Sequence, residues 1–242
     1  MMLGILGFMW ACFFAGALAI HRANRNADPP AKRERWIKYA VYFLTVHVVV
    51  GSALAGPVYF QALAALIATL GAYELLKVIF QNQGEGKRFR PVTLFSLGLY
   101  LTLAYCLLLF SSRANPGTIV FVYLVIVALD GFSQVIGELI GSRPFAPRLS
   151  PKKTVEGAAG GFAAAIVTAV ALRSLAEFSL SQALVAGCLL SAAGFIGDLS
   201  ASYFKRLHGV KDFGRILPGH GGVLDRFDSL LAAAPAFLLW VH

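Results

Sequence analysis

Residues 117–141 read GTIVFVYLVIVALDGFSQVIGELIG, a nearly uninterrupted apolar stretch. A helix needs about 20 apolar residues to cross the hydrocarbon core of a bilayer, so this stretch is long enough to span it. Seven further runs of the same kind lie along the chain. The eight expected spans are Leu3–Ile20, Trp36–Ala55, Pro57–Phe80, Pro91–Ser111, Gly117–Gly141, Gly157–Ala176, Leu180–Leu199 and Val223–Val241. The sequence therefore predicts an all-α, polytopic integral membrane protein with about eight transmembrane helices.

The composition supports this class. Of 242 residues, 58% are hydrophobic and 14% are charged, and the mean hydropathy is +0.71. A soluble domain is about half apolar and about a quarter charged, so the composition argues against a soluble globule and excludes a disordered chain. The net charge of +9 would suggest a nucleic-acid partner for a soluble protein, but in a membrane protein it indicates basic loops on one side. The cysteines lie inside apolar runs without Cys-x-x-Cys spacing, so we expect neither disulfides nor a thiolate metal site.

The basic residues predict the topology. Four connecting segments, 21–35, 81–90, 142–156 and 200–222, together with Lys38, Lys77 and Arg226 at helix ends, hold 19 of the 21 Lys and Arg residues. The positive-inside rule places these segments in the cytoplasm and both chain termini on the opposite side. The first run is not preceded by a basic residue and is followed by a basic cluster, which favours a retained helix over a signal peptide.

Acidic residues gather near the cytoplasmic side of the C-terminal half: Asp130, Glu138, Glu156, Asp198, Asp212, Asp225 and Asp228. An ionisable residue inside a span is costly and usually faces the bundle interior or a water-filled cavity. Asp225 and Asp228 share one helical face, and Asp198 ends the preceding span at a similar depth. These three carboxylates could form a structural ion network with nearby Lys and Arg, or they could bind a hard divalent cation such as Mg²⁺.

A second polar segment, SPKKTVEG at residues 150–157, leads into a Gly- and Ala-rich helix. A helix start flanked by Lys152, Lys153 and Thr154 suits phosphate binding, although paired lysines at a membrane edge also serve as topology anchors. The small residues that follow, through 165, predict close helix packing. By contrast, we interpret Glu74, Lys77 and Glu85 as membrane-interface residues.

The segment from Ser202 to Asp228 reads SYFKRLHGVKDFGRILPGHGGVLDRFD. It contains Ser-x-x-Lys-Arg, Lys-Asp, Pro-Gly-His-Gly-Gly and Asp-Arg-x-Asp in order. With Gly197-Asp198-Leu199 and the 150–157 segment, this pattern resembles the phosphatidate cytidylyltransferase (CDP-diacylglycerol synthase) family. The resemblance covers the C-terminal half, whereas the N-terminal half is similar only in being hydrophobic.

The resemblance implies a nucleotidyltransferase of phospholipid biosynthesis that converts CTP and phosphatidic acid to CDP-diacylglycerol and pyrophosphate. Both reactants are polyanions, so their repulsion must be cancelled, and divalent metal with Lys and Arg side chains does this in phosphoryl transfer generally. Mg²⁺ is the implied cofactor, with a second cation left open. The implied setting is the cell's inner or plasma membrane with the active site facing the cytoplasm, and the implied assembly is a homodimer. Membrane lipids are expected partners and nucleic acid is not.

The resemblance also implies roles for individual residues. Residues 1–116 would be the transmembrane scaffold and lipid-facing region, and 117–242 the catalytic region of a single unit. The implied metal ligands are Asp198, Asp225 and Asp228. The implied phosphate contacts are Lys152, Lys153, Thr154, Lys205, Arg206, Lys211, Gly221, Gly222 and Arg226. The implied catalytic set consists of Asp198, Ser202, Lys205, Arg206, Lys211, Asp212, His220, Asp225, Arg226 and Asp228.

The chain also departs from the family pattern. Ala201 stands where the family usually has Glu, and residues 130–134 read Asp-Gly-Phe-Ser-Gln where it has Asp-Thr-x-Ala-Tyr. Gly141-Ser142 stands in place of Gly-Lys. These changes leave open a divergent paralogue that acts on another lipid phosphate or nucleotide, or a CTP-dependent lipid kinase. An ion-coupled transporter would explain the intramembrane acids, but not the basic, Gly-rich loop beside them.

Overall fold

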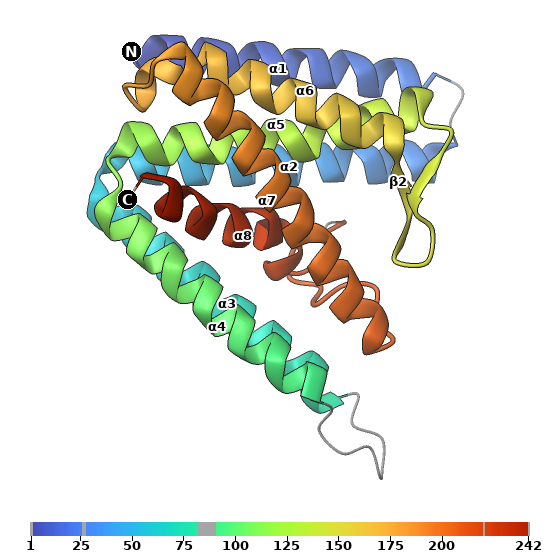
Figure 1. The fold of residues 1–242 in the computed structure, drawn as a ribbon. Helices are drawn as coiled ribbons and strands as arrows, with labels where there is room; N and C mark the ends of the chain where they lie inside the picture. The colour runs from blue at the N-terminus through green and yellow to red at the C-terminus, as the bar shows by residue number, and fades with distance from the viewer. Residues whose placement is uncertain (1, 26–27, 82–90, 220, 242) are drawn as a thin grey trace.

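The structure is a computed structural model, and it describes residues 2–25, 28–81, 91–219 and 221–241. These residues form long helices joined by short connections, with one small β-hairpin (Figure 1). The elements are α1 (Met2–Ala23), α2 (Pro29–Ala55), α3 (Pro57–Gln81), α4 (Pro91–Arg113), α5 (Pro116–Ile140), β1 (Pro144–Ala146), β2 (Ser150–Thr154), α6 (Val155–Ala171), a short 3₁₀ helix (Arg173–Leu175), α7 (Leu180–Leu207) and α8 (Leu224–Val241).

Local sequence signals explain where many helices begin. Proline is the first residue of α2, α3, α4 and α5, a position where its missing N–H costs nothing. The side chain of Asn115 caps α5 by accepting a hydrogen bond of 2.7 Å from the Thr118 N–H. Ser179 and Gln182 form a reciprocal capping box at the start of α7. Between α2 and α3, Gly56 adopts a φ of 138°, a backbone angle that residues with a side chain rarely adopt.

Helix α5 forms the centre of the bundle. Its residues from Ile119 to Ile126 are all buried, which means that neighbours cover it on every side over this stretch. It packs against α2, α6, α7 and α8. The α5–α6 contact is especially close, because a Cβ on Gly161 would lie 2.5 Å from the Leu129 carbonyl oxygen. The expected role of the small residues in 157–165 as packing residues is confirmed.

The expected fold class is confirmed in its general form. Five of the described helices, α2, α3, α4, α5 and α7, are long and apolar enough to cross a membrane, and α6 is a shorter apolar helix. Each of the eight predicted runs coincides with a helix. The hairpin β1–β2, which pairs Pro144 with Thr154, is the exception to an all-α architecture.

Helix α7 continues further than the sequence suggests. The last apolar residue of the seventh run is Leu199, but the helix extends to Leu207 and ends before Gly209, whose φ of 69° permits a left-handed stop. Ser202, Lys205 and Arg206 are therefore helical residues and not loop residues. Their spacing of three and four places them on neighbouring positions of one face.

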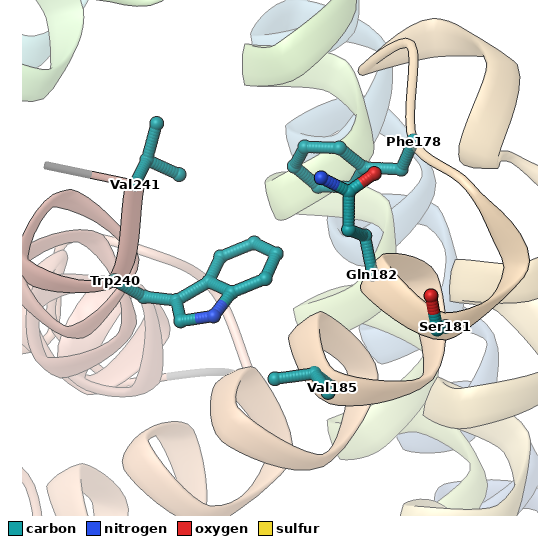
Figure 2. A pocket seen from close by; sticks show the side chains of 6 residues that line it. All are labelled: Phe178, Ser181, Gln182, Val185, Trp240 and Val241. Carbon is teal, nitrogen blue, oxygen red and sulfur yellow. The ribbon is translucent and has the colours of Figure 1, made fainter.

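The two ends of the bundle differ in chemistry. Both termini lie at one end, and the hairpin lies at the other (Figure 1). At the terminal end, a pocket of about 450 Å³ is formed by the start of α7 and the end of α8 (Figure 2). Its lining residues are Phe178, Ser181, Gln182, Val185, Trp240 and Val241. Because Trp240 is 15 residues beyond Asp225 on α8, roughly 22 Å along a helix, this pocket is remote from the acidic residues at the hairpin end.

The close α5–α6 contact predicts a stability effect. Gly161→Ala would place a methyl group against Ser133 and the Leu129 carbonyl, so we expect it to lower the free energy of unfolding by about 1–3 kcal/mol. Gly98→Ala in α4 is the matched control, since nothing lies within 4 Å of its would-be Cβ. Thermal unfolding in detergent measures both. Equal midpoints for the two variants would contradict the assigned α5–α6 packing.

Candidate active site

Asp225 lies in the first turn of α8, and its side chain is almost completely buried. Its Oδ1 accepts a hydrogen bond of 2.7 Å from Lys205 Nζ on α7, and the two side chains are 3% and 11% exposed. Its Oδ2 accepts backbone hydrogen bonds of 2.8 Å from the N–H groups of Phe213 and Gly222. One buried carboxylate thus holds two points of the Gly-rich loop, residues 208–223, against α7.

A second ion pair joins α7 to the hairpin. Lys153 of β2 pairs with Asp198 Oδ2, and its ammonium also lies 5.4 Å from the centre of the Phe195 ring. Ser202, one turn after Asp198, donates to Asp198 Oδ1 at 3.5 Å. Asp198 and Lys153 are partly open to solvent, unlike the Asp225–Lys205 pair.

A third acidic element lies between α5 and α8. Ser229 Oγ donates to Asp130 Oδ1 at 3.2 Å, and the Ser229 N–H donates to Asp228 Oδ1 at 2.8 Å. Asp198 is close enough to Asp130 and to Asp228 to repel both electrostatically, and Arg226 is close enough to attract both. The carboxylates of α5, α7 and α8 therefore lie within electrostatic range of one another.

The hairpin segment is braced by its own polar residues. Thr154 caps α6 by accepting from the Gly157 N–H at 3.1 Å, and Glu156 accepts from the Ser142 hydroxyl and from the backbone N–H groups of Ser142 and Arg143. These donors and the N–H of Glu156 itself hold the pKa of the Glu156 carboxyl at about 2. The segment that was expected to bind phosphate therefore forms strand β2 and the capped start of α6, and its phosphate-binding role stays a prediction.

Arg206 connects this hairpin to α7. Its Nε donates to the Leu149 carbonyl at 3.0 Å, and its Nη1 donates to the Val210 carbonyl at 3.2 Å. A guanidinium has five N–H donors, so Arg206 has further donors beyond those two bonds. Arg206 therefore links α7 to the hairpin segment and also presents a positive charge at the protein surface.

The structure places the other expected residues less centrally. Lys152, Lys211, Asp212 and Arg226 are exposed at the hairpin end. Gly221 has a φ of 85°, and a Cβ there would lie 2.8 Å from Asp225 Oδ2, so glycine is required by the backbone and by the neighbouring carboxylate. The N–H of Gly222, expected at a phosphate, is donated to Asp225. His220 lies outside the described residues.

Sequence reasoning missed the role of Glu74. It was interpreted as an interface residue, but it is 1% exposed, and its carboxylate accepts hydrogen bonds from the N–H groups of Val223 at 3.0 Å and Leu224 at 2.8 Å. The interface interpretation did not foresee this buried contact between α3 and the start of α8. A lone acid within an apolar run was the available signal, but its partners are about 150 residues away along the chain.

A protein-family model matches the part of the chain that contains these site residues. The family model described as the cytidylyltransferase family matches residues 86–242, which is more than half of the chain. The chain belongs to the cytidylyltransferase family. The match contains all of the site residues described above except Glu74.

Individual relatives agree with the family assignment. The chain is 42% identical to a phosphatidate cytidylyltransferase of Staphylococcus saprophyticus over 119 residues, which are 48% of this chain and 46% of the relative. It is 45% identical to a phosphatidate cytidylyltransferase of Brucella abortus over 124 residues, 51% of this chain and 46% of that protein. The chain spans about half the length of the curated relatives it matches.

The carboxylates of this site are the ligand type that Mg²⁺ prefers, but they do not form a complete coordination shell. Among the described residues, no three His, Cys, Asp or Glu side chains form a group that could hold a metal ion. Mg²⁺ usually binds one or two carboxylates and completes its shell with water and substrate phosphates, so a full protein cage is not needed. Asp228 is bonded to the protein through Oδ1, whereas Asp198 and Asp225 each use both oxygens. The Asp198–Lys153 pair is partly open to solvent, so an ion bound by Asp198 would displace the Lys153 ammonium.

The buried ion pair generates a stability prediction. Lys205→Met leaves the Asp225 carboxylate buried without its cation, so we expect a loss of about 3–5 kcal/mol in the free energy of unfolding. Adding Asp225→Asn should recover most of this loss, because no unpaired charge then remains. Lys211→Met is the control, since Lys211 is exposed and should leave stability unchanged. Failure of the double variant to recover stability in a thermal unfolding assay would count against the pairing.

Proposed function

We propose that this protein is a phosphatidate cytidylyltransferase. In the proposed reaction, a phosphate oxygen of phosphatidic acid attacks the α-phosphorus of CTP. The new oxygen–phosphorus bond forms as the bond from the α-phosphorus to the oxygen bridging to the β-phosphate breaks, and pyrophosphate leaves. The observation that carries the proposal is the convergence of Asp130, Asp198 and Asp228 with paired and exposed cations, all within the part of the chain that matches the family.

The arrangement of charges suits two polyanionic substrates. Lys152, Lys211 and Arg226 are exposed at the hairpin end, where they can approach phosphates without breaking a buried pair. Lys153 and Lys205 are already paired with carboxylates, so in the described conformation they set the shape of the site. Preorganised charges of this kind stabilise the developing negative charge on the transferred phosphate and on the leaving pyrophosphate.

Mg²⁺ is part of this proposal. Asp198 and Asp228 would hold the ion, and Asp130 is near enough to contribute charge or to bind a coordinated water. The ion would neutralise phosphate charge and help to orient the CTP phosphates. The other residues of the site would hold the carboxylates at one depth and fix the position of the loop 208–223 relative to α7.

The same proposal includes the membrane arrangement. Eight spans with both termini on the non-cytoplasmic side would place the hairpin and the loop 208–223 at the cytoplasmic face, where CTP is available. The support is the asymmetric distribution of basic residues, with 19 of 21 in or beside the segments at that face. We extend the proposal to a location in the cell membrane and to a homodimer, in line with the family resemblance.

Purified protein in detergent, given Mg²⁺, CTP labelled in the cytidine and phosphatidic acid, tests the function. We expect the label in a lipid product together with stoichiometric release of pyrophosphate. Phosphate transfer with release of CDP would instead identify a CTP-dependent lipid kinase. No turnover with phosphatidic acid but turnover with another lipid phosphate would identify a divergent paralogue, and the stated substrate would then be wrong.

A substitution tests the metal assignment. Asp228→Asn removes one charge from the proposed metal site while keeping the shape of the side chain, so we expect kcat to fall by about 100-fold or more. Asp28→Asn is a matched control, because Asp28 precedes α2 and makes no side-chain cap there. Pyrophosphate release at saturating CTP measures both variants. Near-normal turnover of Asp228→Asn across a magnesium titration would rule out this residue as a ligand.

A further inference from the structure

The buried acid Glu74 lies before residues 86–242, the stretch that the family model matches. Its side chain leaves α3 and reaches the first residues of α8, where it accepts from the N–H groups of Val223 and Leu224. The first N–H groups of a helix have no partner inside the helix, and they carry a partial positive charge. Glu74 supplies both the hydrogen-bond acceptors and the negative charge that this helix start requires.

Two glycines of the loop 208–223 make room for this carboxylate. A Cβ on Gly214 would overlap Glu74 Oε1, and a Cβ on Gly222 would overlap both carboxylate oxygens. Neither glycine has a positive φ, so it is the closeness of Glu74 that requires the missing side chain. The loop is therefore built around the Glu74 carboxylate.

Glu74 and Asp225 each accept hydrogen bonds from two backbone N–H groups in residues 213–224. Asp225 accepts from Phe213 and Gly222, and Glu74 accepts from the next two N–H groups along the chain. Three successive N–H groups, from Gly222 to Leu224, are thus bound by two carboxylates that come from different helices. The first turn of α8, which carries Asp225, Arg226 and Asp228, cannot rotate or shift without breaking these bonds.

We propose that Glu74 is a positioning residue for the reaction. It sets the place of the first turn of α8 relative to α3, and through it the place of Asp228 relative to Asp130 and Asp198. It does not touch substrate, because its oxygens lie beneath the loop and its side chain is buried. The expected effect of Glu74 on turnover rests on the proposed function, whereas its effect on the position of the loop does not.

Glu74→Gln is the first test. The amide keeps the size of the side chain but loses one acceptor and the charge. We expect kcat for pyrophosphate release to fall about 10-fold or more, while KM for CTP changes less than threefold, because the exposed cations remain in place. Amide hydrogen exchange in the peptide covering 213–224 should become faster.

Tyr100→Phe is the matched control. Tyr100 donates to the Ala68 carbonyl at 2.6 Å and so joins α4 to α3 one to two turns from Glu74. Its loss weakens the packing of α3 without touching the start of α8. We expect a lower unfolding temperature for Tyr100→Phe with normal kcat and normal exchange in 213–224. This control separates a positioning role from a general role in stability.

Gly214→Ala is the second variant, and it remains informative if Glu74→Gln does not fold. It keeps the Glu74 charge but displaces the carboxylate, and it should give the same pattern of lowered kcat, little-changed KM and faster exchange. Wild-type kcat within twofold in either folded variant, or equal losses in Tyr100→Phe, would overturn the proposal. If the wild-type protein itself does not turn over phosphatidic acid, the proposed function fails, and the exchange data alone decide whether Glu74 holds α8.

Discussion

The structure depends on the requirement that a carboxylate enclosed by apolar helices must find partners. Asp225 meets it with Lys205 and two backbone N–H groups, and Glu74 meets it with two more. Breaking such a buried pair is costly because it leaves a charge without water or a counterion. The loop 208–223 contains several glycines and little regular structure, so these bonds define its path. The ends of α3, α7 and α8 are joined by the same set of contacts.

The acids of the site consequently fall into two groups. Glu74, Asp225 and Glu156 are occupied by protein donors and shape the loop, the start of α8 and the hairpin. Asp130, Asp198 and Asp228 repel one another, and a bound cation would relieve this repulsion. Asp130 and Asp228 each accept a hydrogen bond from Ser229, whereas Asp198 is paired with Lys153 at a partly open position. The ion-network interpretation therefore describes Asp225, whereas the metal-site interpretation remains a proposal for Asp198 and Asp228.

Much of this arrangement could be predicted from the chain. The apolar runs located the α-helices of the described residues, and the motif at 202–228 located the region that matches the cytidylyltransferase family. Prediction was weaker where a residue's partners are distant in sequence. Asp225 carries the right charge for a metal ligand, but only its contacts reveal that both oxygens accept bonds from the protein. Arg206 and Lys153 likewise resemble phosphate contacts in the sequence. In the structure, Arg206 of α7 also donates to Leu149 beside the hairpin, and Lys153 of the hairpin pairs with Asp198 of α7.

The sequence by itself determined the membrane-protein class, the helix positions and the family, because hydrophobic length and a closely spaced motif are local properties of the chain. Only the tertiary structure decided which protein groups bind each acid, and it alone revealed the contacts of Glu74. The physical reason is that the state of a carboxylate depends on the donors within about 3 Å of it, and here those donors come from other helices. For Glu74 they come from residues about 150 positions further along the chain.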